Sequence, residues 1–166
     1  MDVLTPAGIK TLEDEERAKQ IFECHYPSFK YIHTPKDQPS DIDAILIDQN
    51  RVRGVIETKC RYDVTLEEFN TKYKASWLIT FDKVLKAKAL ADGLRVPLYG
   101  FLYLKQSDVL MVTKIYSDGA FLRKIFIDNT LTQKTVNGGQ IVRTNAYIDM
   151  AGVNVYKFQD KNRGFQ

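Results

Sequence analysis

The pattern of apolar and polar positions in the first part of the chain predicts one helix followed by three strands. Apolar residues recur at near-helical spacing from Thr11, the predicted N-cap, until Pro27 stops the run. Short runs rich in β-branched and aromatic residues predict strands over 29–33, 43–47 and 52–60. Turn residues at 48–50 join the last two strands into a predicted hairpin.

The pattern further along predicts two helices, a buried strand and additional β-hairpins. Thr65 opens a short helix, and Thr80 begins a longer helix with Gly93 at its C-terminal cap. The almost continuous apolar run 96–104 is typical of a buried strand reached by a helical crossover, and turn residues follow at 117–119 and 137–139. This order predicts an α/β (α+β) fold: a mixed central sheet with a helix-strand-strand-strand-helix-strand core flanked by helices, plus C-terminal β-hairpin additions.

Composition limits the domain organisation and the class of protein. A chain of 166 residues with 44% hydrophobic residues supports a single domain over 1–166, with its core at about 11–104 and a β extension at about 105–166. The net charge of +3 excludes a strongly basic coat, but an acidic N-terminal third precedes a basic middle third. Two cysteines without metal-ligand spacing, and no signal-like or bilayer-length apolar run, predict a cytoplasmic protein without a membrane role.

A pair of charges in the predicted third strand is the first sign of chemistry. Glu57 and Lys59 are two residues apart, so their side chains point to the same face of an otherwise apolar strand. An isolated pair of this kind is most simply an ion pair on a half-exposed strand. An acid opposite Glu57 changes that interpretation, because two close carboxylates repel unless one is protonated or a cation binds between them. Mg²⁺ meets that need, since it binds one or two carboxylates together with water and phosphate oxygens.

The length of the predicted hairpin loop decides whether Asp43 is that acid. If a three-residue loop pairs Asp48 with Val52, Asp43 lies directly opposite Glu57 on the same face. A two-residue loop would place Asp43 opposite Ile56 instead and remove the argument.

The two segments that carry these acids resemble the signature of the PD-(D/E)XK nuclease superfamily. They are Asp43-Ala44-Ile45-Leu46-Ile47 and, after a short turn, Val55-Ile56-Glu57-Thr58-Lys59. The element order is also similar to that superfamily's core, and the resemblance covers roughly residues 11–104. The family's proline-aspartate pair is not contiguous here, and Asp41 and Asp43 are both candidates. Asp43 fits better because it directly precedes the apolar strand, whereas Asp41 would oppose Lys59.

The resemblance implies an active site with three catalytic residues, Asp43, Glu57 and Lys59. It also implies that Asp43, Glu57 and the carbonyl of Thr58 bind the metal, and that a glutamate of the first helix assists. The candidates for that glutamate are Glu13, Glu15 and Glu16. Helical geometry favours Glu15, which lies beside the apolar stripe, while Glu16 lies almost opposite it. The simpler alternative is that all three acids only stabilise the helix N-terminus.

The implied function is that of a nuclease that hydrolyses DNA phosphodiester bonds with Mg²⁺, or Mn²⁺, and a metal-activated water. RNA is a second possible substrate, endonuclease action is favoured over exonuclease action, and a homodimer is compatible with the sequence. Candidate nucleic-acid contacts are Lys72, Tyr73, Lys74 and Lys83, with Trp77 available for stacking, although each lysine alone is more simply part of a solvated face. The alternative function is a non-catalytic nucleic-acid- or protein-binding module that retains the nuclease fold.

Overall fold

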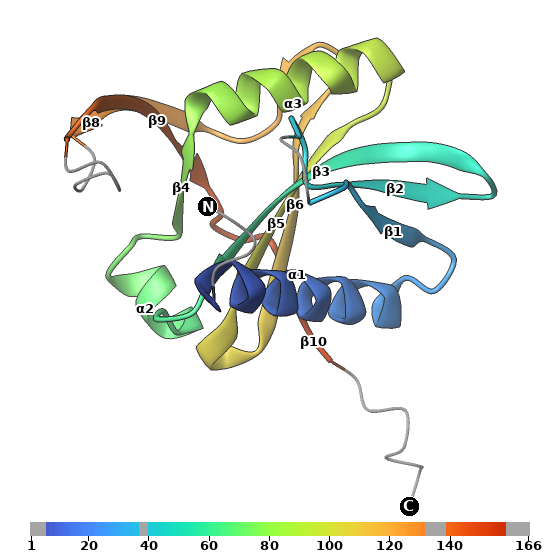
Figure 1. Cartoon of the computed structure of the whole chain (residues 1–166), viewed down its shortest axis with the longest axis horizontal. Helices are drawn as coiled ribbons and strands as arrows, with labels where there is room; N and C mark the ends of the chain where they lie inside the picture. Colours follow the sequence, from blue (N-terminus) through green and yellow to red (C-terminus); the bar gives the residue numbers. More distant parts are fainter. Residues whose placement is uncertain (1–5, 37–39, 132–138, 159–166) are drawn as a thin grey trace, which may run out of the picture.

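The computed structural model describes residues 6–36, 40–131 and 139–158, with side chains from residue 11 onward (Figure 1). Its elements are α1 (Pro6–His25), β1 (Lys30–His33), β2 (Ala44–Asp48), β3 (Arg51–Arg61), α2 (Leu66–Thr71), β4 (Ser76–Thr80), α3 (Phe81–Leu94), β5 (Leu98–Leu104), a 3₁₀ turn (Lys105–Ser107), β6 (Val109–Ser117), β7 (Ala120–Phe121), β8 (Ile125–Leu131), β9 (Val142–Asp149) and β10 (Asn154–Lys157). None of the helices in these ranges has the length and apolarity needed to cross a bilayer.

A mixed sheet forms the centre of the molecule, as the sequence predicts. Its strand order is β1-β2-β3-β5-β6-β10, and the short β7 extends it beside β6. The pairing of β3 with β5 is parallel, and α3 lies in the crossover between them, whereas the other pairs are antiparallel. The predicted fold class, a mixed central sheet flanked by helices, is therefore confirmed.

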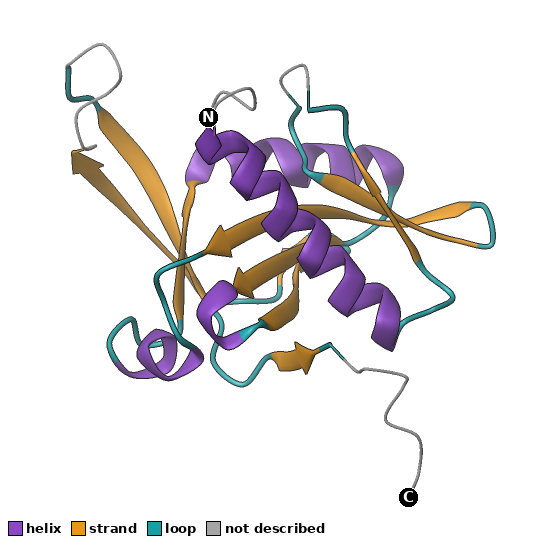
Figure 2. Cartoon of the chain, turned by 60° about the horizontal axis from the view of Figure 1, so that its bottom comes forward, coloured by secondary structure: helices purple, strands orange, loops and turns teal. Residues whose placement is uncertain are grey.

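The two long helices cover opposite faces of this sheet (Figures 1 and 2). On one face, Ile21 and Phe22 of α1 pack in a cluster with Phe101 of β5. On the other face, Val84 and Ala87 of α3 belong to a second apolar cluster. Burial of these apolar stripes is the main force that fixes each helix on the sheet.

A second, three-stranded sheet has the order β4-β9-β8 and was not predicted. Trp77 of β4 pairs with Ile148 of β9, and both are buried in the same apolar cluster as Leu102 of the central sheet. The C-terminal residues therefore do more than add hairpins. β6 and β10 widen the central sheet, and β8 and β9 form the second sheet together with β4. The predicted turn at 117–119 is present, with positive φ at Asp118 and Gly119, whereas 137 and 138 lie outside the described residues.

Several predicted boundaries are confirmed and others are wrong. Thr65 caps α2 in a reciprocal capping box with Glu68, as expected for a helix that opens there. Thr11 is not an N-cap, because α1 already begins at Pro6. Gly93 is not the C-cap of α3 either. The helix continues to Leu94, and Arg95 is the C-cap in the left-handed conformation, with φ 55°. The backbone N–H of Arg95 closes the last turn of the helix.

The hairpin between β2 and β3 reaches the predicted register by a different route. Its loop has two residues, Gln49 and Asn50, both with positive φ, so the predicted three-residue loop is wrong. A β-bulge then inserts Arg53 as an extra residue on β3, because Ile47 pairs with Val52 but Leu46 pairs with Gly54. Beyond the bulge the register is the predicted one, with Ala44 opposite Ile56. The bulge thus corrects the shift that the shorter loop would cause.

Candidate active site

Asp43 lies just before β2, and main-chain contacts fix its carboxylate against β3. Its backbone N–H donates to the carbonyl of Ile56 at 3.0 Å, and its Oδ2 accepts a hydrogen bond from the N–H of Thr58 at 2.8 Å. The regular pairing of β2 with β3 ends at Ala44. The carboxylate of Asp43 therefore accepts the hydrogen bond from the N–H of Thr58 that a main-chain carbonyl would accept in a longer strand. This contact holds the carboxylate beside Glu57.

Glu57 is almost completely buried, with 3% of its surface exposed, and shares a cation with Asp43. The ammonium of Lys83, from the first turn of α3, donates to Glu57 Oε1 at 2.7 Å and lies 3.7 Å from Asp43 Oδ1. The other oxygen, Glu57 Oε2, is buried and has no hydrogen-bond partner in the described part of the chain. Two carboxylates therefore converge around one positive charge, and one oxygen remains available for a further ligand.

The electrostatics of this pair follow from its burial. Desolvation raises the pKa of Glu57, the Asp43 carboxylate raises it as well, and Lys83 lowers it, with a net pKa of about 7. Burial lowers the pKa of Lys83, but the two carboxylates outweigh that effect and leave the pKa raised. The site thus retains a cation in the absence of any metal, because two adjacent buried carboxylates require one.

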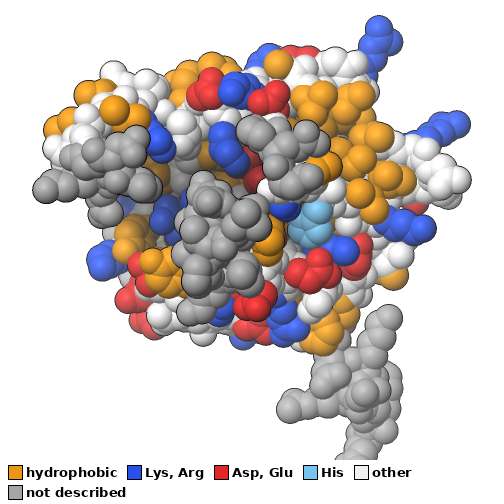
Figure 3. Space-filling model, in the orientation of Figure 1, with side chains coloured by type: hydrophobic (Ala, Val, Ile, Leu, Met, Phe, Trp, Pro, Cys, Tyr) orange, Lys and Arg blue, Asp and Glu red, His pale blue; other side chains and the backbone are white. Residues whose placement is uncertain are grey.

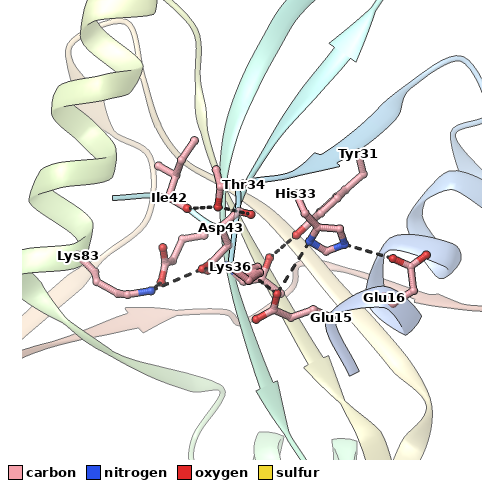
Figure 4. Close-up of polar contacts among 11 residues, drawn as sticks. Glu15, Glu16, Tyr31, His33, Thr34, Lys36, Ile42, Asp43 and Lys83 are labelled. Carbon is pink, nitrogen blue, oxygen red and sulfur yellow. Dashed lines mark hydrogen bonds and ion pairs between the residues drawn. The ribbon is translucent and has the colours of Figure 1, made fainter. Parts of the chain in front are cut away.

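A second lysine links these acids to Glu15 of α1 (Figure 4). Lys36 Nζ lies 2.8 Å from Glu15 Oε2 and 3.7 Å from Asp43 Oδ1. Glu15 is 8% exposed, and His33 of β1 lies between it and Glu16, at 3.9 Å and 3.3 Å respectively. The structure thus brings Glu15, the predicted helix residue, next to the pair of acids through an intervening ammonium. Its role toward a metal stays a prediction.

Thr58 and Lys59 complete the predicted motif on β3. The hydroxyl of Thr58 is hydrogen-bonded to the hydroxyl of Tyr31 at 2.7 Å, which anchors β3 to β1 through a buried contact. Lys59 is exposed on the same face of β3 as Glu57, with no ion pair or hydrogen bond among the described residues. Partial desolvation lowers its pKa, and the charges of Arg61 and Lys83 lower it further. Its ammonium is therefore free to contact a bound phosphate.

The predicted nucleic-acid contacts separate into two groups. Lys83 lies inside the site and neutralises its acids, so it is not part of a solvated helix face. Lys72, Tyr73 and Lys74 are exposed around the connection from α2 to β4, and the Lys72 ammonium lies 5.3 Å from the centre of the Tyr73 ring. Trp77 is 1% exposed, so the expectation that it is available for stacking is wrong.

Two of the functional candidates were missed by the sequence analysis or left without a role. Lys36 follows β1 in a polar tract that shows no distinctive pattern, and His33 is one of two histidines without a partner motif. Asp41, the alternative acid, is exposed and lies 3.8 Å from Lys86, whereas Asp43 shares the ammonium of Lys83 with Glu57. The face drawn in Figure 3 carries both acidic and basic side chains. The selection of a ligand on this face therefore depends on the local geometry of the site and not on a basic surface.

The residues present fit a hard divalent cation. Asp43 and Glu57 offer carboxylate oxygens side by side. The buried Oε2 of Glu57 has no hydrogen-bond partner among the described residues and can therefore bind a cation. Among the described residues, no three His, Cys, Asp or Glu side chains form a metal-binding cluster. Mg²⁺ does not require one, because it commonly binds through one or two carboxylates and takes its other ligands from water and phosphate.

Comparison with known proteins gives a partial likeness of fold to a solved structure. No protein-family model matches the chain, and neither does any curated protein. Among solved structures, the chain is similar to Hjc, a Holliday junction resolvase from the hyperthermophilic archaeon Archaeoglobus fulgidus. The identity is 15%, the TM-score is 0.43, and the match covers 61% of this chain and 74% of the resolvase. What this chain does has to be inferred from its own side chains.

Proposed function

We propose that this protein is a divalent-metal-dependent nuclease that hydrolyses phosphodiester bonds of DNA, as an endonuclease that uses Mg²⁺. The observation that carries the proposal is the convergence of Asp43 and Glu57 around a single ammonium, with Glu57 Oε2 buried and unpartnered. Burying two carboxylates together is costly, and a divalent cation bound between them would offset that cost. Lys59, on the same strand face, adds a charge without a partner in this part of the molecule.

The proposed roles follow from the position of each side chain. Asp43 and Glu57 would hold the metal, together with the carbonyl of Thr58, and the N–H of Thr58 keeps Asp43 oriented. The metal would supply Lewis-acid polarisation of a phosphate oxygen and activation of a water molecule. Lys59 would offset the negative charge that develops on the phosphate, a role that suits the compact charge of a lysine.

The two bridging lysines would change partners when substrate and metal enter. Lys83 and Lys36 neutralise the acids in the metal-free protein. A divalent cation repels both ammonium groups, and incoming phosphates attract them. We infer that these lysines then bind the phosphates that flank the scissile bond, so the same charges serve the empty and the occupied site.

A cleavage assay tests the proposal directly. The protein is incubated with linear, circular, single-stranded and branched DNA, and with RNA, in Mg²⁺, Mn²⁺, Ca²⁺ or EDTA. Cleavage of DNA is expected in Mg²⁺ and Mn²⁺, and little turnover in Ca²⁺, which is larger and less demanding in geometry. Products from circular DNA identify endonuclease action. Undiminished cleavage in excess EDTA would rule the mechanism out.

Variants at the motif separate an enzyme from a binding module. Asp43→Asn should weaken Mg²⁺ binding in calorimetry, because it removes a charged ligand. Lys59→Ala leaves both carboxylates intact, so it should still bind Mg²⁺ and DNA while its cleavage rate falls by a factor on the order of 10². Wild-type protein that binds DNA in Mg²⁺ but cuts none of the substrates, with Lys59→Ala indistinguishable from it, would instead support the non-catalytic module.

A further inference from the structure

A recessed pocket lies further along β3 from the candidate active site and is not used by the mechanism above. It has a volume of about 350 Å³ and lies between β3, the start of β4 and β9. Its polar and aromatic lining includes Arg61, Asp63, Tyr73, Trp77 and Tyr147, and we call it the aromatic pocket. The volume falls within the range of pockets that bind small organic groups, about 300–1,000 Å³.

The strand β3 leads from the candidate active site directly into this pocket. Glu57, Lys59 and Arg61 alternate along β3, so their side chains share one face of the strand. At about 3.3 Å per residue, Arg61 lies about 13 Å along the strand from Glu57. The pocket is therefore within a few nucleotides of the carboxylates for any nucleic-acid strand that follows β3.

A glycine on the neighbouring strand keeps the tryptophan at the junction of the two sites. Gly100 of β5 pairs with Glu57, and a methyl group added at Gly100 would overlap the indole ring of Trp77. The indole thus lies over β5 next to Glu57 and also forms one wall of the aromatic pocket. Trp77 is the only tryptophan of the chain, so its fluorescence can report on the pocket.

The chemistry of the lining matches an unpaired nucleotide. Arg61 has no ion-pair or hydrogen-bond partner among the described residues, and its guanidinium can bind phosphate or stack on a base. Tyr73 and Tyr147 supply aromatic faces, and base stacking on such faces is the common mode of single-strand binding. Asp63 can accept a hydrogen bond from the exocyclic amino group of a base.

A second hollow adjoins the aromatic pocket. It shares Tyr147 with the aromatic pocket and adds Lys74, Lys124 and Phe126. Phe126 is 66% exposed and its ring lies 6.0 Å from that of Tyr147. The two adjoining hollows thus offer both aromatic rings and basic side chains, the groups that bind a single strand.

We propose that the aromatic pocket binds an unpaired base of a single-stranded DNA segment. Bases inside a duplex are paired, stacked and out of reach, so a base that enters the pocket has to be unpaired. The position of the base next to the scissile phosphate rests on the proposed nuclease function, but its binding does not. The preferred substrate would then be DNA that contains a single-stranded segment beside the cleavage point.

The test follows Trp77 fluorescence in EDTA, where no cleavage occurs. Ten-residue oligodeoxycytidylate should change the fluorescence in a saturable way, and a blunt hairpin duplex of the same length should not. Arg61→Ala and Tyr147→Leu should each weaken binding at least fivefold, the change that corresponds to the loss of about 1 kcal/mol from one stacked base. Tyr147→Phe, which keeps the ring, should bind like the wild type.

Arg53→Ala is the matched control, because Arg53 is exposed on the same strand at the hairpin end. Unchanged fluorescence, equal binding of the duplex, or Arg61→Ala and Tyr147→Leu that bind like Arg53→Ala would overturn the aromatic pocket. Circular dichroism confirms that each variant is folded. The two proposals fail separately: DNA cleavage without a fluorescence change overturns only the pocket, and a saturable change without cleavage overturns only the nuclease.

Discussion

Lys83→Met tests the electrostatics of the candidate site most directly. The substitution keeps the length of the side chain but leaves the Glu57 and Asp43 carboxylates without the ammonium that lies 2.7 Å and 3.7 Å from them. Removing one partner of a buried ion pair costs about 3–5 kcal/mol, whereas exposed pairs contribute about 0.2–1 kcal/mol. The Glu57 side chain is 4% exposed and that of Lys83 45%. We therefore expect an intermediate loss of about 2 kcal/mol in the free energy of unfolding at pH 8 in EDTA.

The deficit of Lys83→Met should depend on pH in a defined direction. The pKa of Glu57 is raised to about 7 even with Lys83 present, mainly by burial. Removal of the Lys83 ammonium should therefore raise the pKa of Glu57 further. Protonated Glu57 no longer requires a cation. The stability difference between variant and wild type should therefore be largest above pH 7 and shrink toward pH 5. Mg²⁺ should raise the melting temperature of the variant more than that of the wild type, because the divalent ion replaces the missing charge.

Urea denaturation followed by circular dichroism measures these differences at pH 5 and pH 8. Lys86→Met is the matched control, because Lys86 lies on the same helix and its ion pairs within the described residues are with the exposed acids Asp41 and Asp82. It should change stability by less than about 0.5 kcal/mol. The double variant with Glu57→Gln should recover part of the loss, since it removes the carboxylate that was left unpaired. If Lys83→Met equals Lys86→Met at both pH values, the electrostatic account of the site is wrong.

Gly100→Ala should lower the free energy of unfolding by about 1–3 kcal/mol, because the added methyl group would overlap the buried indole of Trp77. Gly93→Ala has open space around it and should stabilise α3 by up to about 1 kcal/mol. Urea denaturation measures both changes. In EDTA, the free energy of unfolding of the wild type relative to Glu57→Gln should fall by at most about 3 kcal/mol as pH rises from about 4.5 to about 7. The reason is that the raised pKa of Glu57 favours the protonated form in the folded state. A stability difference that does not change with pH would contradict the buried carboxylate. Glu15→Gln should lower the cleavage rate less than Asp43→Asn, because Glu15 reaches the other acids only through a lysine; an equal loss in the cleavage assay would place it among the essential groups.

The central part of the candidate site could be predicted because strand geometry carries most of the information. Alternation along β3 places Glu57 and Lys59 on one face whatever the tertiary structure. The approach of Asp43 depended on the hairpin register, and the assumed loop length was wrong. The register was nevertheless right, because the bulge at Arg53 compensates for the shorter turn. A bulge of this kind has no clear signal in a single sequence.

The contacts that surround the acids could not be predicted, because they depend on packing between distant segments. Lys36 and Lys83 resemble the other lysines of the chain until α1 and α3 are fixed on opposite faces of the sheet. The strand β4 was missed for a similar reason. Its partner is β9, so only a long-range pairing makes the segment around Trp77 a strand rather than a connection between two helices.

The pairing of β4 with β9 also determines when the site can form during synthesis. Lys83 follows β4 directly, and the only strand that pairs with β4 in the described residues is β9, formed by Val142–Asp149. Contacts between segments so far apart in the chain form late, because the intervening loop must first be closed. A nascent chain that has emerged only as far as β6 carries Asp43, Glu57 and Lys59 but lacks the strand that anchors the start of α3. The motif can therefore be complete in sequence on the ribosome well before the cation that balances it is held in place.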